Sequence, residues 1–227
     1  MMQAAVLLCI WFLSAMAGVD LERARDLQDK VVLQAAVEEL TKIADRRPND
    51  AGAHYRLALA ESYLSEVAFE TRDKGLAQLA AEAGIRAAQK AVAIQSNVAE
   101  YHRLLGTLCG QVIPANVLFG LKYGKCATES ISKALELDPK YSMAWLSRGI
   151  GNYYLPASLG GGVELALRDF DKAIELQPKN AEAYLWKGIA LRKLNRNAEA
   201  RAALLRSLEL NPRRIWAKQQ LEKTPAQ

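Results

Sequence analysis

Small and large apolar residues recur at fixed spacings along most of the chain, and this pattern predicts pairs of packed helices. In the unit nearest the carboxyl end, the recurring positions are Tyr184, Gly188, Ala200, Leu204, Ser207 and Pro212. Small residues allow two helices to approach closely, and large residues fill the space between them. A proline just after a helix keeps that helix from continuing. The distance from Pro178 to Pro212 is 34 residues, which is the length of a helical hairpin that stacks on its neighbours.

The same pattern occurs three more times, beginning near His54, His102 and Trp145. The expected units are a degenerate helix at 20–48, repeats at about 51–96, 99–139, 142–178 and 181–212, and a capping helix at 213–223. The three earlier repeats are longer than 34 residues because extra residues separate their two helices. We expect residues 18–227 to form one continuous solenoid.

These units resemble tetratricopeptide repeats, and the resemblance covers the chain from Gly52 to Pro212. It implies an all-α, open right-handed superhelix of about ten helices without strands. Composition favours the same fold class, because Ala and Leu dominate the 51% of hydrophobic residues, with the helix-forming Glu, Lys and Arg around them.

The amino-terminal segment has the features of a secretory signal. An apolar run from Ala4 to Leu13 is followed by Ala15-Met16-Ala17, an A-x-A cleavage site. The run is shorter than the roughly 20 residues of a membrane span. We therefore predict a signal peptide at 1–17 and a periplasmic or secreted protein that does not span the membrane after cleavage. The alternatives are an uncleaved anchor and lipidation of Cys9.

Cleavage leaves Cys109 and Cys126 in an oxidising compartment, where disulfides persist. Gly106 and Gly110 precede a turn and Gly120 and Gly124 follow it, and such spacing permits a close helix crossing. A disulfide is therefore possible, and two small buried thiols are the alternative.

The sequence offers no catalytic constellation. The two histidines, His54 and His102, occupy the same repeat position as Trp145 and Tyr184, so packing explains them. Three consecutive glycines at 160–162 are read as a flexible turn, because no Lys-Ser/Thr follows to complete a phosphate-binding loop. We predict a protein that is not an enzyme and that has neither a cofactor nor a metal site.

The resemblance also selects a binding surface, because the first helix of each tetratricopeptide hairpin lines a concave groove. The groove positions here hold Tyr55, Tyr63, Arg103, Gln111, Tyr153, Tyr154, Arg192 and Lys193. Tyrosines offer contact area with a polar tip, and arginine offers a fork for carboxylates, so the set suits a peptide or an anionic amphiphile. Residues from Lys187 onward carry an excess of positive charge, but export argues against nucleic acid as the partner.

Insertions such as 155–162, ahead of Ala166 and Phe170, narrow the resemblance. They are similar to those of periplasmic repeat proteins associated with tripartite (TRAP-type) transporters and to those of the regulator of microtubule dynamics family. The first resemblance implies a transporter component as partner, and the second implies mainly a fold. We expect an adaptor that holds a protein or peptide in its groove. The alternative is a carrier of a small hydrophobic or anionic ligand, with an apolar pocket built by the insertions 112–123 and 153–162.

Overall fold

The computed structural model describes residues 20–113 and 118–226, and it is all-helical over this range. The predicted signal peptide at 1–17 therefore lies outside the described residues. Eleven α-helices and one 3₁₀ helix occupy the described part: α2 (Leu21–Asp26), α3 (Lys30–Arg46), α4 (Ala51–Glu70), α5 (Lys74–Ile94), α6 (Ala99–Val112), α7 (Phe119–Leu137), α8 (Ser142–Tyr154), η2 (Ala157–Leu159), α9 (Val163–Leu176), α10 (Ala181–Lys193), α11 (Asn197–Leu210) and α12 (Ile215–Glu222).

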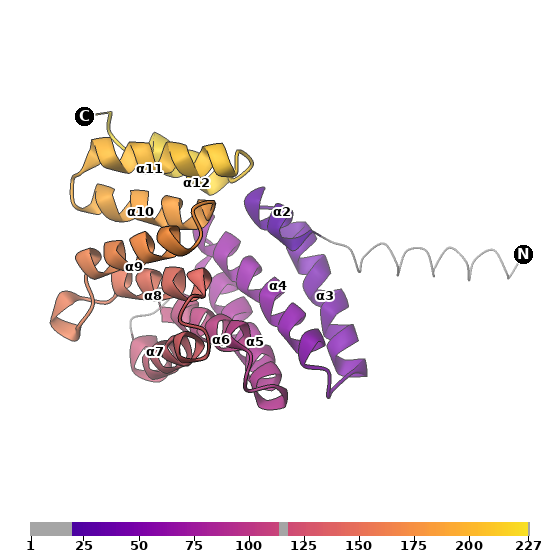
Figure 1. Cartoon of the computed structure of the whole chain (residues 1–227). Helices are drawn as coiled ribbons and strands as arrows, with labels where there is room; N and C mark the ends of the chain where they lie inside the picture. Colours follow the sequence, from indigo (N-terminus) through magenta and orange to yellow (C-terminus); the bar gives the residue numbers. More distant parts are fainter. Residues whose placement is uncertain (1–19, 114–117, 227) are drawn as a thin grey trace, which may run out of the picture.

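Four helical hairpins stack in chain order, α4–α5, α6–α7, α8–α9 and α10–α11 (Figure 1). The repeated small residues are needed where the two helices of a hairpin cross. A Cβ at Gly149 would lie 2.5 Å from Phe170 Cε1, and a Cβ at Gly188 would lie 2.6 Å from Leu204 Cγ. Both distances are far below van der Waals contact, so only glycine allows these crossings. The all-helical solenoid predicted from the sequence is confirmed.

The insertion between α8 and α9 is a tight turn built around η2. Gly160 and Gly162 have φ values of 87° and 122°, which glycine adopts without a steric penalty. A Cβ at Gly161 would lie 2.3 Å from the Leu155 carbonyl oxygen. Backbone geometry and close packing therefore account for the three consecutive glycines.

The amino-terminal segment differs from the single helix expected at 20–48. The chain turns at Gln28, which has a φ of 53°, and this turn separates α2 from α3. Asp29 then caps α3, because its carboxylate accepts a hydrogen bond from the Val32 amide at 3.0 Å. The N-cap aspartate supplies a local start signal for a second helix, and α2 is free to take its own direction.

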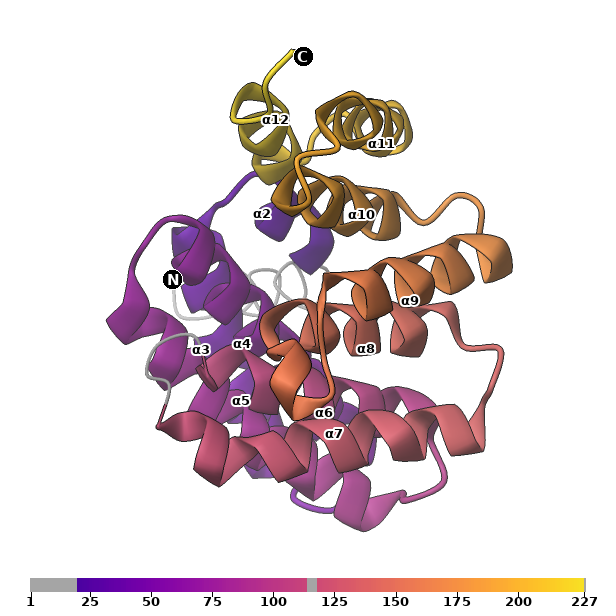
Figure 2. The same cartoon turned by 90° about the vertical axis from the view of Figure 1, so that its left-hand side faces the viewer.

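An open superhelix was expected from the sequence, and this expectation was wrong, because the two ends of the array meet. In both views α2 lies beside α10 and α12 (Figures 1 and 2). Asn211 Nδ2 donates to Asp26 Oδ2 at 2.7 Å, and the side-chain amides of Gln28 and Gln219 bond to each other. The first and last parts of the array are therefore in direct contact.

Candidate binding surface on the concave face

The first helices of the four hairpins form the inner side of the array. Contacts join α4 to α6, α6 to α8 and α8 to α10, and Figure 2 shows these helices around the centre of the array. This inner side is the concave face that the groove positions were expected to line.

One carboxylate organises the amino-terminal half of this face. Glu100 accepts hydrogen bonds from Tyr55 Oη at 3.0 Å, from Arg103 Nη2 at 2.7 Å and from Tyr141 Oη. Burial by itself would raise the pKa of Glu100, but the Arg103 guanidinium and these hydrogen bonds lower it overall. Arg103 is only 7% exposed and also donates to Thr107 and Ser147. Tyr55 and Arg103 thus connect α4, α6 and α8 to one another.

Tyr63 and Gln111 also have partners within the chain. The Arg25 guanidinium lies 5.0 Å from the centroid of the Tyr63 ring, and burial raises the pKa of Tyr63 to about 12. The Gln111 amide bonds to Ser62 through both its oxygen and its nitrogen. In this structure these two residues fasten α2 and α6 to α4.

The carboxyl-terminal half presents a group of rings, Tyr153, Tyr154, Trp186 and Trp216, which we call the aromatic wall. Centroid distances are 5.9 Å for Tyr153–Trp186, 6.1 Å for Tyr154–Trp186 and 5.2 Å for Trp186–Trp216, all with tilted or edge-on geometry. The two tryptophans are buried, whereas Tyr154 is 45% exposed. The Lys193 ammonium lies 4.3 Å from the Tyr153 ring centroid, so a cation borders the wall.

Arg192, the remaining groove residue, is a support for α12. Its guanidinium donates to the Gln220 carbonyl at 3.0 Å and to Gln220 Oε1 at 2.7 Å. Of the eight predicted groove residues, Tyr153, Tyr154 and Lys193 therefore lie together at an accessible edge. The other five bind other parts of the chain, and whether any of the eight contacts a partner stays a prediction.

The groove pattern missed a group of charges that joins the two ends of the array, which we call the seam. It consists of Arg25, Asp26, Glu66, Glu70, Glu182 and Arg214. Arg214 is 1% exposed and binds Glu182 Oε1 at 2.9 Å, together with Glu66 and Glu70. Burial raises the pKa of Glu70 to about 7 although Arg214 opposes the rise. Glu182 alone carried a signal in the sequence, since it stands at the second position of the last repeat, a groove position.

Both histidines have the same structural role. His54 Nε2 lies 2.9 Å from the Pro48 carbonyl oxygen, and His102 Nε2 lies 2.8 Å from that of Ser96. At the same repeat position, Trp145 Nε1 donates to the Pro139 carbonyl at 2.9 Å. The position therefore ties the first helix of each of these hairpins to the loop before it.

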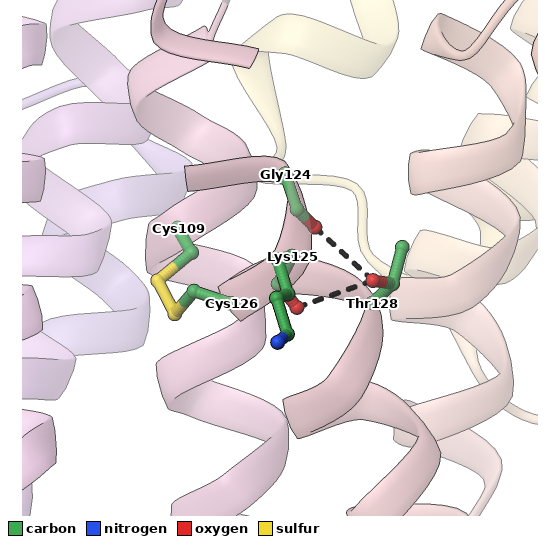
Figure 3. The surroundings of a disulfide bond; sticks show 5 residues. All are labelled: Cys109, Gly124, Lys125, Cys126 and Thr128. Atoms are coloured by element: carbon green, nitrogen blue, oxygen red, sulfur yellow. Dashed lines mark hydrogen bonds between the residues drawn. A yellow bond between two sulfur atoms is a disulfide. The ribbon is translucent and has the colours of Figure 1, made fainter. Parts of the chain in front are cut away.

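Cys109 on α6 and Cys126 on α7 are joined by a disulfide, with Cα atoms 6.0 Å apart (Figure 3). Next to it, Thr128 Oγ1 donates to the carbonyl oxygens of Gly124 and Lys125 at 3.1 and 3.2 Å. The reasoning from four paired glycines was wrong in part. A Cβ would collide with α7 at Gly106, but at Gly110 and Gly124 it would meet nothing within 4 Å.

Two other features, a membrane span and a metal site, concern residues 20–113 and 118–226. No helix in these ranges is both long enough and apolar enough to cross a membrane. They also contain no cluster of three or more His, Cys, Asp or Glu side chains placed to bind a metal ion.

Comparison with known proteins identifies one of the families that the sequence was said to resemble. The model of the family described as "Regulator of microtubule dynamics protein 1-3" matches residues 20–223. The chain belongs to this family. One of the two narrower resemblances is thereby confirmed, and the resemblance to transporter-associated proteins stays a prediction. Comparison with curated proteins gives no match.

Solved structures with the same fold include TTC0263, a thermophilic tetratricopeptide-repeat protein of Thermus thermophilus. It is 17% identical, with a TM-score of 0.61 over 88% of this chain and 97% of that one. The HusA haemophore of Porphyromonas gingivalis is also 17% identical, with a TM-score of 0.57 over 80% of this chain and 90% of that one. At such identities the likeness establishes the fold alone, a stack of helical hairpins.

Proposed function

We propose that this protein is a non-enzymatic adaptor, exported to the periplasm or secreted, that binds a protein or peptide partner on its concave face. The observation that carries the proposal is the aromatic wall. Buried Trp186 and Trp216 hold Tyr154 and Tyr153 in place from behind, and Lys193 lies beside them. Rigid aromatic side chains that are preorganised and partly exposed are typical anchors for a partner chain.

The nature of the partner follows from the chemistry at this edge. Tyrosine faces take apolar or proline side chains, their hydroxyl groups bond to a peptide backbone, and Lys193 favours a nearby carboxylate. We therefore expect the partner to be a peptide segment with apolar and acidic residues.

The test places a photo-cross-linking amino acid at Tyr154 in the native host, with Glu175 on α9 as the matched control position. Glu175 is exposed and lies on a second helix, away from the inner side. We expect one specific protein to be cross-linked from position 154 and not from 175. A Tyr153→Ala/Lys193→Ala variant should reduce recovery at least about tenfold, as expected for loss of an anchor worth ~1.4 kcal/mol or more. Equal cross-linking from both positions would argue against this surface.

The second candidate is a carrier of a small hydrophobic or anionic ligand, and the fold of the HusA haemophore supports it as a class. A hollow of about 380 Å³ lies between α3 and α4, beside Leu40, Ile43 and Tyr55. The pocket expected from the insertions 112–123 and 153–162 stays a prediction, since residues 114–117 lie outside the described range. Native mass spectrometry of protein from its own host separates the two candidates. A stoichiometric small molecule that co-purifies would favour the carrier.

A further inference from the structure

The contact between the two ends of the array is chemically unlike the contacts within it. Neighbouring hairpins share apolar clusters, one around Phe170 and Trp186 and one around Leu104 and Leu108. A third cluster joins α2 and α3 to α4 and α5. None of these three clusters contains residues from both ends. Within the described residues, the seam is held by ion pairs and by the amides of Gln28, Asn211 and Gln219.

The charges of the seam do not balance. Four carboxylates, those of Asp26, Glu66, Glu70 and Glu182, surround the two guanidiniums of Arg25 and Arg214. Buried ion pairs lose hydration energy that their attraction barely recovers, and like-charge repulsion among the carboxylates reduces the gain further. Separating the two ends would rehydrate all six groups. The closed arrangement therefore gains little stability from its ion pairs.

The part that would move is small. Helix α2 has six residues, too few to be stable alone, and it turns into α3 at Gln28. Its Arg25 lies over Tyr63 and 3.4 Å from Glu182 Oε1. Both Tyr63 and Glu182 stand at groove positions of their repeats. While the seam is closed, the chain's own α2 thus covers groove residues that a partner would otherwise reach.

We propose that the seam is a reversible closure of the array, and that a partner segment enters the concave face when α2 and α12 separate. The entry of a partner rests on the proposed function. The separation of the two ends does not, because it is a property of the chain alone. It makes α2 an autoinhibitory contact. The protein exists as a closed form, which the structure describes, and an open form in which Glu182 becomes accessible and α2 stays on α4 through its apolar cluster.

Spin-label distance measurements test the opening directly. Labels at Val31→Cys on α3 and Lys218→Cys on α12 lie on opposite sides of the seam and at exposed positions. The full chain is used with Cys9→Ser, and Cys109 and Cys126 are unreactive in their disulfide. We expect a main short distance and a minor long one. Arg25→Gln or 1 M NaCl should enrich the long distance about tenfold, the effect of losing one partly buried ion pair.

The matched control is Arg148→Gln, which breaks an ion pair with Asp169 inside the α8–α9 hairpin. It should leave the distance distribution unchanged. Arg214→Gln is the stronger variant, and Arg25→Gln remains informative if loss of Arg214 unfolds α12. A single short distance that persists in Arg25→Gln at 1 M NaCl, with helicity intact, would overturn the proposal.

A covalent lock separates this inference from the proposed function. Gln28→Cys and Gln219→Cys, whose side chains are in contact across the seam, are joined by a short bifunctional maleimide. The locked protein should lose cross-linking from position 154 at least about tenfold relative to the same variant left unjoined and blocked with a small maleimide. If the locked protein still captures the partner, the closure idea fails and the adaptor stands. If neither form captures a partner, the adaptor fails, and the spin-label distances alone decide the opening.

Discussion

Glu61 is a buried carboxyl whose replacement should stabilise the protein, with a clear dependence on pH. It lies on α4 where that helix packs against α5, and a Cβ at Gly84 would be 3.0 Å from Glu61 Cβ. Only 7% of the residue is exposed, and no hydrogen bond to its carboxyl is seen within the described residues. The corresponding repeat position holds Cys109, Asn152 and Leu191 in the later hairpins, so the slot faces inward in each of them.

The magnitude follows from the pKa. Burial raises the pKa of Glu61 from its ordinary 4.5 to about 7, and the opposing effect of Arg86 is smaller. The unfolded chain releases this proton first, so stability falls as pH rises from about 4.5 to 7 and the penalty is complete above that. A difference of ~2.5 pKa units corresponds to about 3 kcal/mol.

The perturbation is Glu61→Gln, which keeps the shape of the side chain and removes its charge. Urea unfolding followed by far-UV circular dichroism should show a gain of about 3 kcal/mol at pH 8.5 and less than ~1 kcal/mol at pH 5. In thermal melts the gain at pH 8.5 corresponds to ~6–12 °C for a chain of this size. Glu38→Gln, at an exposed position on α3, is the control and should change little at either pH. The reasoning is refuted if Glu61→Gln shifts stability equally at pH 5 and pH 8.5.

Four further outcomes test the packing. Reducing the disulfide, or replacing Cys109 and Cys126 by Ala, should cost ~3 kcal/mol because it frees a loop with a sequence separation of 17 residues, as measured by urea unfolding with and without reductant. Gly106→Ala should destabilise the array by ~1–3 kcal/mol, since its Cβ would lie 2.7 Å from an isoleucine on α7. Gly110→Ala, one turn further on the same helix and free of such contacts, should instead stabilise it by ~0.5–1 kcal/mol. Arg103→Ala should cost ~1.5–3 kcal/mol in the same assay, because it leaves the half-buried carboxylate of Glu100 without its cation.

Most of the fold could be predicted from the sequence because the same spacing of small and large residues recurs in each repeat. Gly149 and Gly188 mark the crossings, and each is forced to be small by a large residue at the same repeat position of the second helix, Phe170 and Leu204. A pattern seen four times is specific even where each occurrence is weak. Tyr153 and Tyr154 were assigned to groove positions in the same way, since position in the repeat determines which face of a helix they occupy.

The partners of the groove residues could not be predicted by this rule. Arg103 and Tyr55 look like free groove side chains in the sequence, but both bind Glu100. Whether a polar side chain faces a partner or a neighbouring helix depends on where an oppositely charged group lies on the next hairpin. The turn at Gln28 was missed for a related reason, since an N-cap aspartate such as Asp29 resembles any polar residue in a helix until its hydrogen bond is seen.

The sequence by itself determined the helices, their pairing and the order in which the hairpins stack, because these follow from contacts between residues near one another in the chain. Only the tertiary structure decided that the array closes. The contacts of the seam join Glu70 to Arg214, Asp26 to Asn211 and Gln28 to Gln219, at separations of 144, 185 and 191 residues. Whether the ends meet depends on the sum of the small rotations between successive hairpins. Each crossing and each insertion contributes to that sum, and no single segment of the sequence contains it.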